Sequence, residues 1–364
     1  MQALWQMHAG TLGVSDPYPD QLFEADLTAG YYYRPLPPYF DPAVSFGAGS
    51  LGDPYVNVAN GTLTWAATDY SLGGRGPVTT LARTYNSGDG RDGPFGFGWS
   101  LPYAMGLQEN ADGSVTVANF DGRRDYYTKS GSTYTAPAGT ETTLVENPDS
   151  SWTLTYRDHT AKSFDAAGKL TAVRDADGNA TALAYTSGRL STITDAVGRV
   201  FTLSYDANGR VSGISLPLSR SLAYGYDAAG NLTSYTDAAG KVTSYAYASD
   251  HRLSTVTDPS GRVTTFAWTT ARRVKSRTDD FGATTSYAYT SAGAGGGTTT
   301  ATDPRGTQTI HTFDARHRQT RLEVVVPGAS NLVTLLAYDG DDQLTQATTR
   351  AGWSPPSPTT PRAT

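Results

Sequence analysis

Large apolar residues alternate with polar ones along most of residues 166–345. Residues two apart on a strand share one face, because successive side chains point to opposite sides. Each such segment is therefore predicted to be a strand with one apolar face. The apolar pairs are Leu183 and Tyr185, Leu203 and Tyr205, Tyr224 and Tyr226, Tyr245 and Tyr247, Phe266 and Trp268, and Tyr287 and Tyr289.

The alternation belongs to an internal repeat of about 21 residues. Three tracks share its register, and such agreement predicts a repeat architecture. The first Asp of a D-x-x-G motif recurs at Asp175, Asp195, Asp237, Asp258, Asp279 and Asp303, and its Gly at Gly178, Gly198, Gly240, Gly261, Gly282 and Gly306, with Leu216 and Ser219 in one degenerate copy. The aromatic track is Tyr185, Tyr205, Tyr226, Tyr247, Trp268, Tyr289 and Phe313.

The D-x-x-G motif predicts a tight turn between two strands of each unit. Its Asp can accept backbone N–H bonds in an Asx-turn, and its Gly can take the left-handed conformation without a Cβ penalty. A second turn, such as residues 205–209, links one unit to the next. The first strand of each unit carries aliphatic residues three apart, such as Val211 and Ile214. Because three is an odd step, we expect a bulge or twist there.

A single hairpin is marginal in water, so stacking of neighbouring units must create the core. The aromatic face of the sheet needs a cover, from curling of the sheet or from another part of the molecule. Rows of Tyr and Trp can also stack on sugars. Since the phase of these rows is locked to the strand period, the pattern favours core packing.

Composition narrows the classes of function. Charged residues are 17% of the chain, while Gly (39) and Tyr (23) are plentiful, which favours strands and turns over helices. A formal net charge of −6 provides no basic field, so nucleic acid is not an expected partner. The chain has no Cys, which excludes disulfides and thiolate metal sites.

Targeting signals are not evident in the sequence. Residues 1–10 lack a basic region and an unbroken apolar run, so no signal peptide is predicted. The most apolar later stretch, residues 322–338, contains Glu323 and Pro327 and is not expected to form a transmembrane segment.

The repeat unit resembles the YD repeat of Rhs-type proteins, bacterial wall-associated proteins and teneurins. Its pattern is G-x-[LV]-x-x-[IV]-x-D-x-x-G followed by alternating Thr and aromatic residues and Tyr-Asp, and residues 230–240 are a close instance. Residues 53–61, 83–87 and 93–100 look like the domain of unknown function that opens the repeat region in many Rhs-type proteins. The resemblance implies an all-β antiparallel YD-repeat meander that curls into part of a shell or spiral sheet.

Four segments are expected along the chain. Residues 1–50 are a Pro/aromatic linker or docking segment, residues 51–165 an N-terminal β domain, residues 166–345 the YD repeats, and residues 346–364 a Pro-rich disordered tail. Because seven or so units without a plug would not close a container, we expect the isolated chain to present a curved sheet with an exposed apolar inner face.

The resemblance implies a shell around a C-terminal toxin, or adhesion at a cell surface. The D-P-x-G-L self-cleavage signature of the family is absent: residues 258–261 and 303–306 come closest, but Arg262 and Thr307 replace the Leu. Neither autoproteolysis nor toxicity is therefore carried over to this chain.

Candidate chemistry is weak. Residues 47–52 match G-x-G-x-x-G but precede Asp53 and Pro54 rather than a helix, so a turn is favoured. Asp175 and Asp177 resemble part of a calcium loop, but its acidic twelfth residue is replaced by Thr186. The five His residues are not spaced for a metal site, and no strict G-x-S-x-G elbow is present. We expect no catalytic residues, cofactor or metal.

The sequence thus predicts a non-enzymatic structural shell segment of an Rhs-type polymorphic toxin or surface protein. Its expected partners are a toxin cargo or further shell segments, and its expected location, by resemblance, is secreted or at the cell surface. The alternative is a surface adhesion or carbohydrate-binding repeat module, which would use surface glycans.

Overall fold

The computed structural model describes residues 54–351, apart from residues 121, 138–139, 292–295, 327–329 and 341–343. The expected linker at residues 1–50 lies outside the described residues, as do residues 352–364 of the expected tail. Two compact units divide the rest: residues 63–263, and residues 56–62 with 264–351. Each unit is described by itself below.

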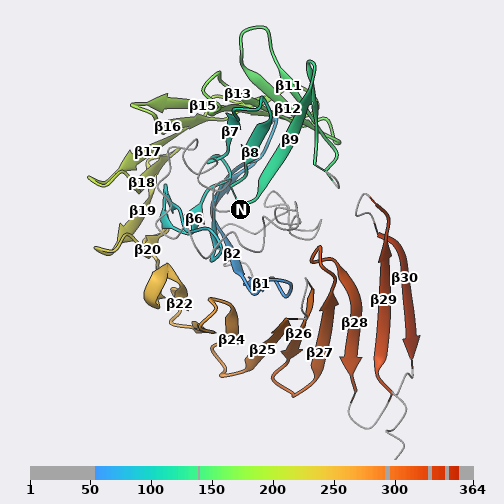
Figure 1. Cartoon of the computed structure of the whole chain (residues 1–364). Helices are drawn as coiled ribbons and strands as arrows, with labels where there is room; N and C mark the ends of the chain where they lie inside the picture. Colours follow the sequence, from blue (N-terminus) through green and yellow to red (C-terminus); the bar gives the residue numbers. More distant parts are fainter. Residues whose placement is uncertain are drawn as a thin grey trace, which may run out of the picture. The chain divides into compact units, whose positions relative to one another are not determined.

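The regular secondary structure of the described residues is β-strand throughout, apart from one 3₁₀ turn at Ser249–His251 (Figure 1). All recorded strand pairs are antiparallel. The first strands are β1 (Tyr55–Val56), β2 (Leu63–Leu72), β3 (Thr79–Asn86), β4 (Asp92–Gly93), β5 (Gly96–Phe97) and β6 (Trp99–Ser100).

A long meander follows these strands. It begins with β7 (Gly106–Glu109), β8 (Val115–Ala118), β9 (Arg124–Ser130), β10 (Thr133–Thr135), β11 (Thr142–Glu146), β12 (Trp152–Tyr156), β13 (Ala161–Phe164), β14 (Leu170–Arg174), β15 (Ala180–Thr186), β16 (Arg189–Thr194), β17 (Val200–Tyr205) and β18 (Val211–Leu216). It continues with β19 (Arg220–Tyr226), β20 (Leu232–Thr236), β21 (Val242–Tyr247), β22 (Leu253–Thr257), β23 (Val263–Trp268), β24 (Val274–Thr278), β25 (Thr284–Ser291), β26 (Gly297–Thr302), β27 (Gln308–Phe313), β28 (Gln319–Val325), β29 (Leu332–Tyr338) and β30 (Leu344–Ala351). The predicted all-β antiparallel meander is confirmed.

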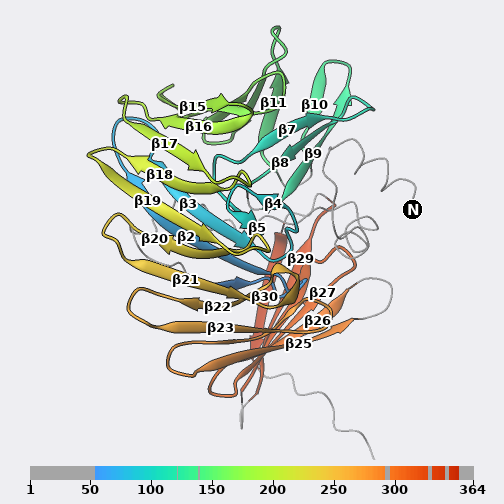
Figure 2. The same cartoon turned by 90° about the vertical axis from the view of Figure 1, so that its left-hand side faces the viewer.

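In the first unit, the sheet from β7 to β22 packs against a second, small sheet. The long hairpin of β2 and β3, with β6 at its side, forms that small sheet. In Figure 2 the blue strands β2 and β3 lie behind the green-to-yellow strands β17–β21. The larger sheet also curls back on itself, because the backbone N–H of Leu107 on β7 donates to the carbonyl of Gly168, which precedes β14.

The expected bulge occurs in successive repeats. Tyr205 pairs with Val211 while the preceding Ser204 pairs with Gly213, so Ser212 is the extra residue. The same shift occurs at Tyr185, Tyr226, Tyr247 and Trp268. Since a bulge inserts one residue, two aliphatic residues three apart can face the same side. Val211 and Ile214 are accordingly both buried.

The hairpin of β2 and β3 covers the aromatic face of the repeats in the first unit. Tyr224, Tyr235 and Tyr245 are only 5–6% exposed. This corrects the expectation of an exposed apolar inner face for this unit, because residues upstream of the repeats supply the cover.

In the second unit, strands β24–β30 pair in chain order. Its own core includes Val274, Phe313 and Val333. The loop at residues 57–61 packs here: the N–H of Val274 donates to the carbonyl of Gly61, 2.9 Å away. A Cβ on Gly61 would lie 2.5 Å from the Cβ of Arg273, so the loop approaches this repeat too closely for any other residue.

Two expected boundaries differ from the structure. The sheet continues across residue 165, because β13 and β14 pair on either side of it. Residues 346–351, expected within a disordered tail, belong to β30, which pairs with β29 up to Ala351. Thr345, Thr348 and Thr349 are β-branched and suit a strand, so the period fades in sequence before the ladder ends. The rest of the four-segment division stays a prediction.

The turn glycines with left-handed backbone conformation allow a test of backbone strain in which the added Cβ makes no steric clash. Gly240 has φ +79° and nothing within 4 Å of an added Cβ. We expect Gly240→Ala to lower the free energy of unfolding by about 1–2 kcal/mol, because an L-residue is strained there. Gly73 is the matched control, since its Cβ would also meet nothing and its φ is not positive. Urea denaturation that shows equal effects for Gly240→Ala and Gly73→Ala would contradict this account.

Candidate functional site at the hairpin–repeat interface

The predicted D-x-x-G residues form one recurring turn. Asp258 is typical: its Oδ1 accepts the backbone N–H groups of Ser260 (2.8 Å) and Arg262 (3.0 Å). The N–H of Gly261 donates to the carbonyl of Asp258. The same Oδ1 contacts to the second and fourth following residues occur at Asp175, Asp195, Asp237 and Asp279, and φ is between +79° and +84° at Gly178, Gly198, Gly240, Gly261 and Gly282. The contacts of each turn are local and stabilise its own hairpin.

The predicted aromatic residues form a second recurring unit, the Tyr module. The hydroxyl of each Tyr donates to the carbonyl of the residue fifteen positions earlier, near the start of a strand, as Tyr205 does to Leu190 (2.6 Å). The residue before that carbonyl places its cation over the ring, as Arg189 does over Tyr205 (5.6 Å). The hydroxyl bond recurs at Tyr185, Tyr226, Tyr247 and Tyr289, and the cation at Lys169, Arg210 and Arg273.

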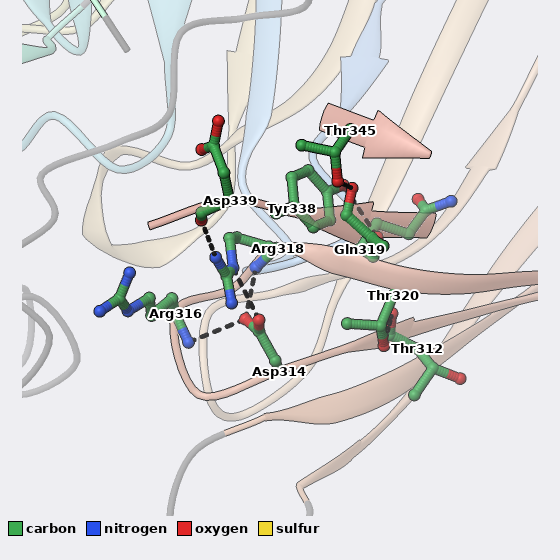
Figure 3. Close-up of polar contacts among 10 residues, drawn as sticks. Thr312, Asp314, Arg316, Arg318, Gln319, Thr320, Tyr338, Asp339 and Thr345 are labelled. Carbon is green, nitrogen blue, oxygen red and sulfur yellow. Dashed lines mark hydrogen bonds and ion pairs between the residues drawn. The ribbon is translucent and has the colours of Figure 1, made fainter. Parts of the chain in front are cut away.

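Figure 3 shows a longer version of this module in the second unit. The hydroxyl of Tyr338 donates to the carbonyl of Gln319 (2.9 Å), and Arg318 lies over the ring of Tyr338 (5.2 Å). Asp314 holds Arg318 through a 2.7 Å ion pair. The turn residue and the aromatic residue therefore support each other across neighbouring strands.

A buried ion pair is the polar centre of the first unit. Arg83 on β3 donates to Asp69 on β2 through Nε (2.6 Å) and Nη2 (2.8 Å). Their side chains are 0% and 1% exposed. The repeats complete the set: Tyr224 donates to the Asp69 carboxylate (2.8 Å), and Arg83 donates to the Tyr245 hydroxyl (3.1 Å). Two strands of the hairpin and two strands of the repeat sheet therefore share one hydrogen-bond network.

Aromatic rings enclose the guanidinium of Arg83. Its Cζ lies 4.4 Å from the ring centroid of Tyr235, with the rings of Trp99, Tyr224 and Tyr245 at 5.2–5.5 Å. Tyr235 also donates to the carbonyl of Asp69 (3.0 Å). Cation–π attraction is strongest where the cation is desolvated, so the rings offset part of the cost of burying this charge.

Burial fixes the protonation states in this network. Burial lowers the pKa of Arg83, but the Asp69 carboxylate and the neighbouring Tyr hydroxyls outweigh it and hold that pKa well above its ordinary value. Burial and the charge of Asp69 raise the pKa of Tyr224 well above its ordinary value, so its hydroxyl stays a donor. Burial also raises the pKa of Asp69, against the effect of Arg83. The positive charge of Arg83, which is held firmly, suits an anchoring role.

A second contact joins β5 to the repeats. The ring of His251 stacks on Phe97 with centroids 3.7 Å apart, and its Nδ1 lies 2.7 Å from Oδ1 of Asn231. The carbonyl of His251 accepts the hydroxyl of Tyr85 (3.1 Å). Burial lowers the pKa of His251, although Asp227, Asp92 and Asp250 oppose this effect.

Of the predicted aromatic residues, Tyr247 joins this site by accepting the indole N–H of Trp99 (2.7 Å). Trp268 and Tyr289 belong to the second unit.

The sequence analysis did not identify Arg83 and Asp69 as site residues. The available signal was a single charged residue in the middle of each of two otherwise uncharged strands, at residues 63–72 and 79–86. Among the described residues, no group of three or more metal-ligating side chains is present.

The fold and the site together define an all-β repeat protein whose N-terminal hairpin is held by its own repeats. The model of DUF6531, a domain of unknown function, matches residues 52–127, and the RHS-repeat model matches residues 164–200, 186–221, 205–242, 226–249 and 247–284. The chain belongs to the RHS-repeat proteins, which confirms the resemblance of its sequence to them.

Curated relatives match a limited part of the chain. The tRNA nuclease WapA of Bacillus subtilis (strain 168) is 36% identical over 131 residues, which are 36% of this chain and 6% of that protein. The tRNA3(Ser)-specific nuclease WapA of Bacillus spizizenii is 33% identical over 131 residues, with the same two shares. The chain thus matches only a small fraction of the length of these relatives.

Solved structures with similar strands include TcdB2-TccC3-TEV, with a TM-score of 0.32 and 12% identity, covering 80% of this chain and 22% of that chain. TcdB2-TccC3 without the hypervariable C-terminal region has a TM-score of 0.31 and 11% identity, covering 82% and 20%. These scores are too low to define a fold, which rests here on the strand pairing.

In the described part of the chain, no helix has the length and apolarity to span a membrane.

The buried pair allows a test of its anchoring role. We expect Arg83→Met to lower the free energy of unfolding of the first unit by about 3–5 kcal/mol, because it leaves the Asp69 charge buried without its partner. The double variant with Asp69→Asn should lose less than the single one, since no uncompensated charge remains. Chemical denaturation measures both.

The control for this test is the exposed pair of Arg157 and Glu141, whose side chains are 81% and 65% exposed. Arg157→Met should change stability by no more than about 1 kcal/mol. An Arg83→Met effect as small as that of Arg157→Met would show that the buried pair does not anchor the hairpin.

The contact of His251 predicts a dependence of stability on pH. Since folding lowers its pKa below the ordinary 6.5, its neutral form stabilises the fold above that pH, and this contribution is lost as the pH falls through the folded value. We expect thermal melts at pH 7 and pH 5 to show a smaller acid-induced drop for His251→Asn than for the wild type. Asn suits the backbone of His251, whose φ is +60°. Equal drops in both proteins would exclude a contribution from His251.

Proposed function

We propose that this chain is a non-enzymatic wall segment of an Rhs-type β-sheet shell whose cargo follows the repeats in the full-length protein. The observation that carries the proposal is the Arg83–Asp69 pair, which tyrosines from three successive repeat strands enclose. Its contacts hold the hairpin and the repeats together and leave Arg83 and Asp69 inaccessible to substrate. An interior built in this way supports a packing role and not a catalytic one.

The family supports a toxin-related role. The curated relatives are named as tRNA nucleases, but the aligned residues are only 6% of their length. Nuclease activity therefore belongs to those proteins, and we assign none to this chain. From the family alone, we propose that the partners are a toxin cargo or further shell segments, and that the location is secreted or at the cell surface.

The alternative, a glycan-binding or adhesion module, would use exposed rows of aromatic residues. Tyr224, Tyr235 and Tyr245 are instead packed against the hairpin. No observation on the described residues favours this alternative over the wall segment.

Protease protection tests encapsulation in the natural full-length protein. We expect any segment encoded beyond residue 364 to resist limited proteolysis. In the Arg83→Met variant the wall is weakened, so we expect the protease to digest that segment faster. The exposed Arg157→Met variant serves as the control and should behave as the wild type. Equal and rapid digestion of that segment in all three proteins, or a gene that encodes nothing beyond residue 364, would contradict encapsulation.

Non-enzymatic character has a separate test. The chain should leave a mixture of tRNAs intact on a denaturing gel after prolonged incubation with divalent cations. Cleavage that co-purifies with the chain and persists across independent preparations would show that it is an enzyme.

A further inference from the structure

The first unit contains a cavity of about 460 Å³ beside the first two Tyr modules. One wall carries Lys169 and Arg189, whose cations lie over the rings of Tyr185 (5.5 Å) and Tyr205 (5.6 Å). Its apolar lining includes Leu101, Leu190 and Leu203. A volume of this size is within the range of ligand pockets, about 300–1,000 Å³.

In the described part of the chain, neither the ammonium of Lys169 nor the guanidinium of Arg189 forms an ion pair with a carboxylate, and both cations lie over tyrosine rings. The backbone N–H of Lys169, not its ammonium group, donates to Oδ1 of Asp165 (2.9 Å). Arg210, the equivalent residue of the next repeat, lies over Tyr226 (5.8 Å) and binds the Asp92 carboxylate through Nε (3.0 Å) and Nη2 (2.6 Å). The same module therefore occurs with and without a carboxylate in one unit.

The segment that occupies the Arg210 module does so through three contacts. Asp92 supplies the carboxylate, and the carbonyl of Pro94 accepts the N–H of Val211 (2.8 Å). Phe95, 1% exposed, packs against Tyr224 with ring centroids 4.8 Å apart. An acidic residue followed three positions later by an aromatic one is thus a ligand that this repeat already binds.

The preceding repeat presents the corresponding groups to the cavity. Arg189, Leu190 and Tyr205 occupy the repeat positions of Arg210, Val211 and Tyr226, and all three line the cavity. The hydroxyl of Tyr205 bonds the carbonyl of Leu190 as that of Tyr226 bonds the carbonyl of Val211. We propose that this cavity binds a peptide segment of another polypeptide, with an Asp on Arg189 and an aromatic residue three positions later in the apolar part.

Charge supports this choice of ligand. Lys169 adds a second cation on the same wall, and Arg91 and Arg124 also line the cavity. Arg91 is paired with Asp89. A cavity lined by cations and by apolar side chains favours an acidic peptide, because a carboxylate bound to guanidinium gains charge-assisted hydrogen bonds.

Peptide binding to the full chain tests the proposal. The probe is a fluorescent peptide with the sequence of residues 92–97, Asp-Gly-Pro-Phe-Gly-Phe, and the matched control peptide has Asn in place of its Asp. We expect saturable binding of the Asp peptide by fluorescence anisotropy, and binding at least about tenfold weaker for the Asn peptide. Arg189→Gln should weaken binding of the Asp peptide to a similar extent.

Control variants keep the outcome interpretable. Lys241→Gln alters an exposed lysine that does not line the cavity and should bind as the wild type. The melting temperature of each variant shows whether it is folded. Absence of binding, or equal binding of both peptides or of the wild type and a folded Arg189→Gln variant, would overturn the proposal.

Two other occupants would give distinct results. Concentration-dependent self-association in sedimentation experiments, abolished by Arg189→Gln, would assign the cavity to a second copy of the chain. Peptide binding that occurs only after removal of residues 1–50 would assign it to a segment of the chain itself. Either result would overturn binding of a separate polypeptide.

Discussion

The charge of Arg83 must be compensated inside the protein, and the first unit is organised around that constraint. A guanidinium removed from water is tolerated only where hydrogen bonds and opposite charge replace its hydration. Asp69 provides the charge from the same hairpin, but the hydroxyls and all of the rings except that of Trp99 come from the repeats. The hairpin therefore has no low-energy conformation with this pair buried until the repeats surround it. Folding of the repeats and docking of the hairpin are energetically coupled through this one pair.

Much of the fold could be predicted from the sequence, because each element is set by local chemistry that repeats. The position of Gly178 three residues after Asp175 dictates a turn, and the spacing of Leu183 and Tyr185 dictates a strand face. The odd step from Val211 to Ile214 indicated the bulge. These signals depend on residues a few positions apart, and repetition makes each of them visible several times.

The site at the hairpin could not be predicted in the same way. Asp69 and Tyr224 are 155 positions apart, and nothing in either local sequence indicates that they meet. Strand patterns showed that the aromatic face needed a cover without identifying which segment supplies it. The expected exposed face was wrong in the first unit for this reason, since partner choice depends on complementary shape and charge over long separations. The fading of the period after Leu344 was misleading for a related reason, because strand pairing with β29 continues without the aromatic track.

The bulges explain why the repeats need other segments at their sides. At the first residue of a bulged strand, the N–H can point to an acceptor outside the ladder, and the acceptor comes from a segment upstream of the repeats. Val211 bonds the carbonyl of Pro94, Leu253 bonds the hydroxyl of Tyr85, and, within the second unit, Val274 bonds the carbonyl of Gly61. Since an unpaired buried N–H is costly, each bulge leaves a backbone donor that needs an acceptor, and a loop of suitable sequence can supply that acceptor. The upstream residues thus act as matched partners of individual repeats, which is why segments as short as residues 57–61 and 92–95 pack so closely against them.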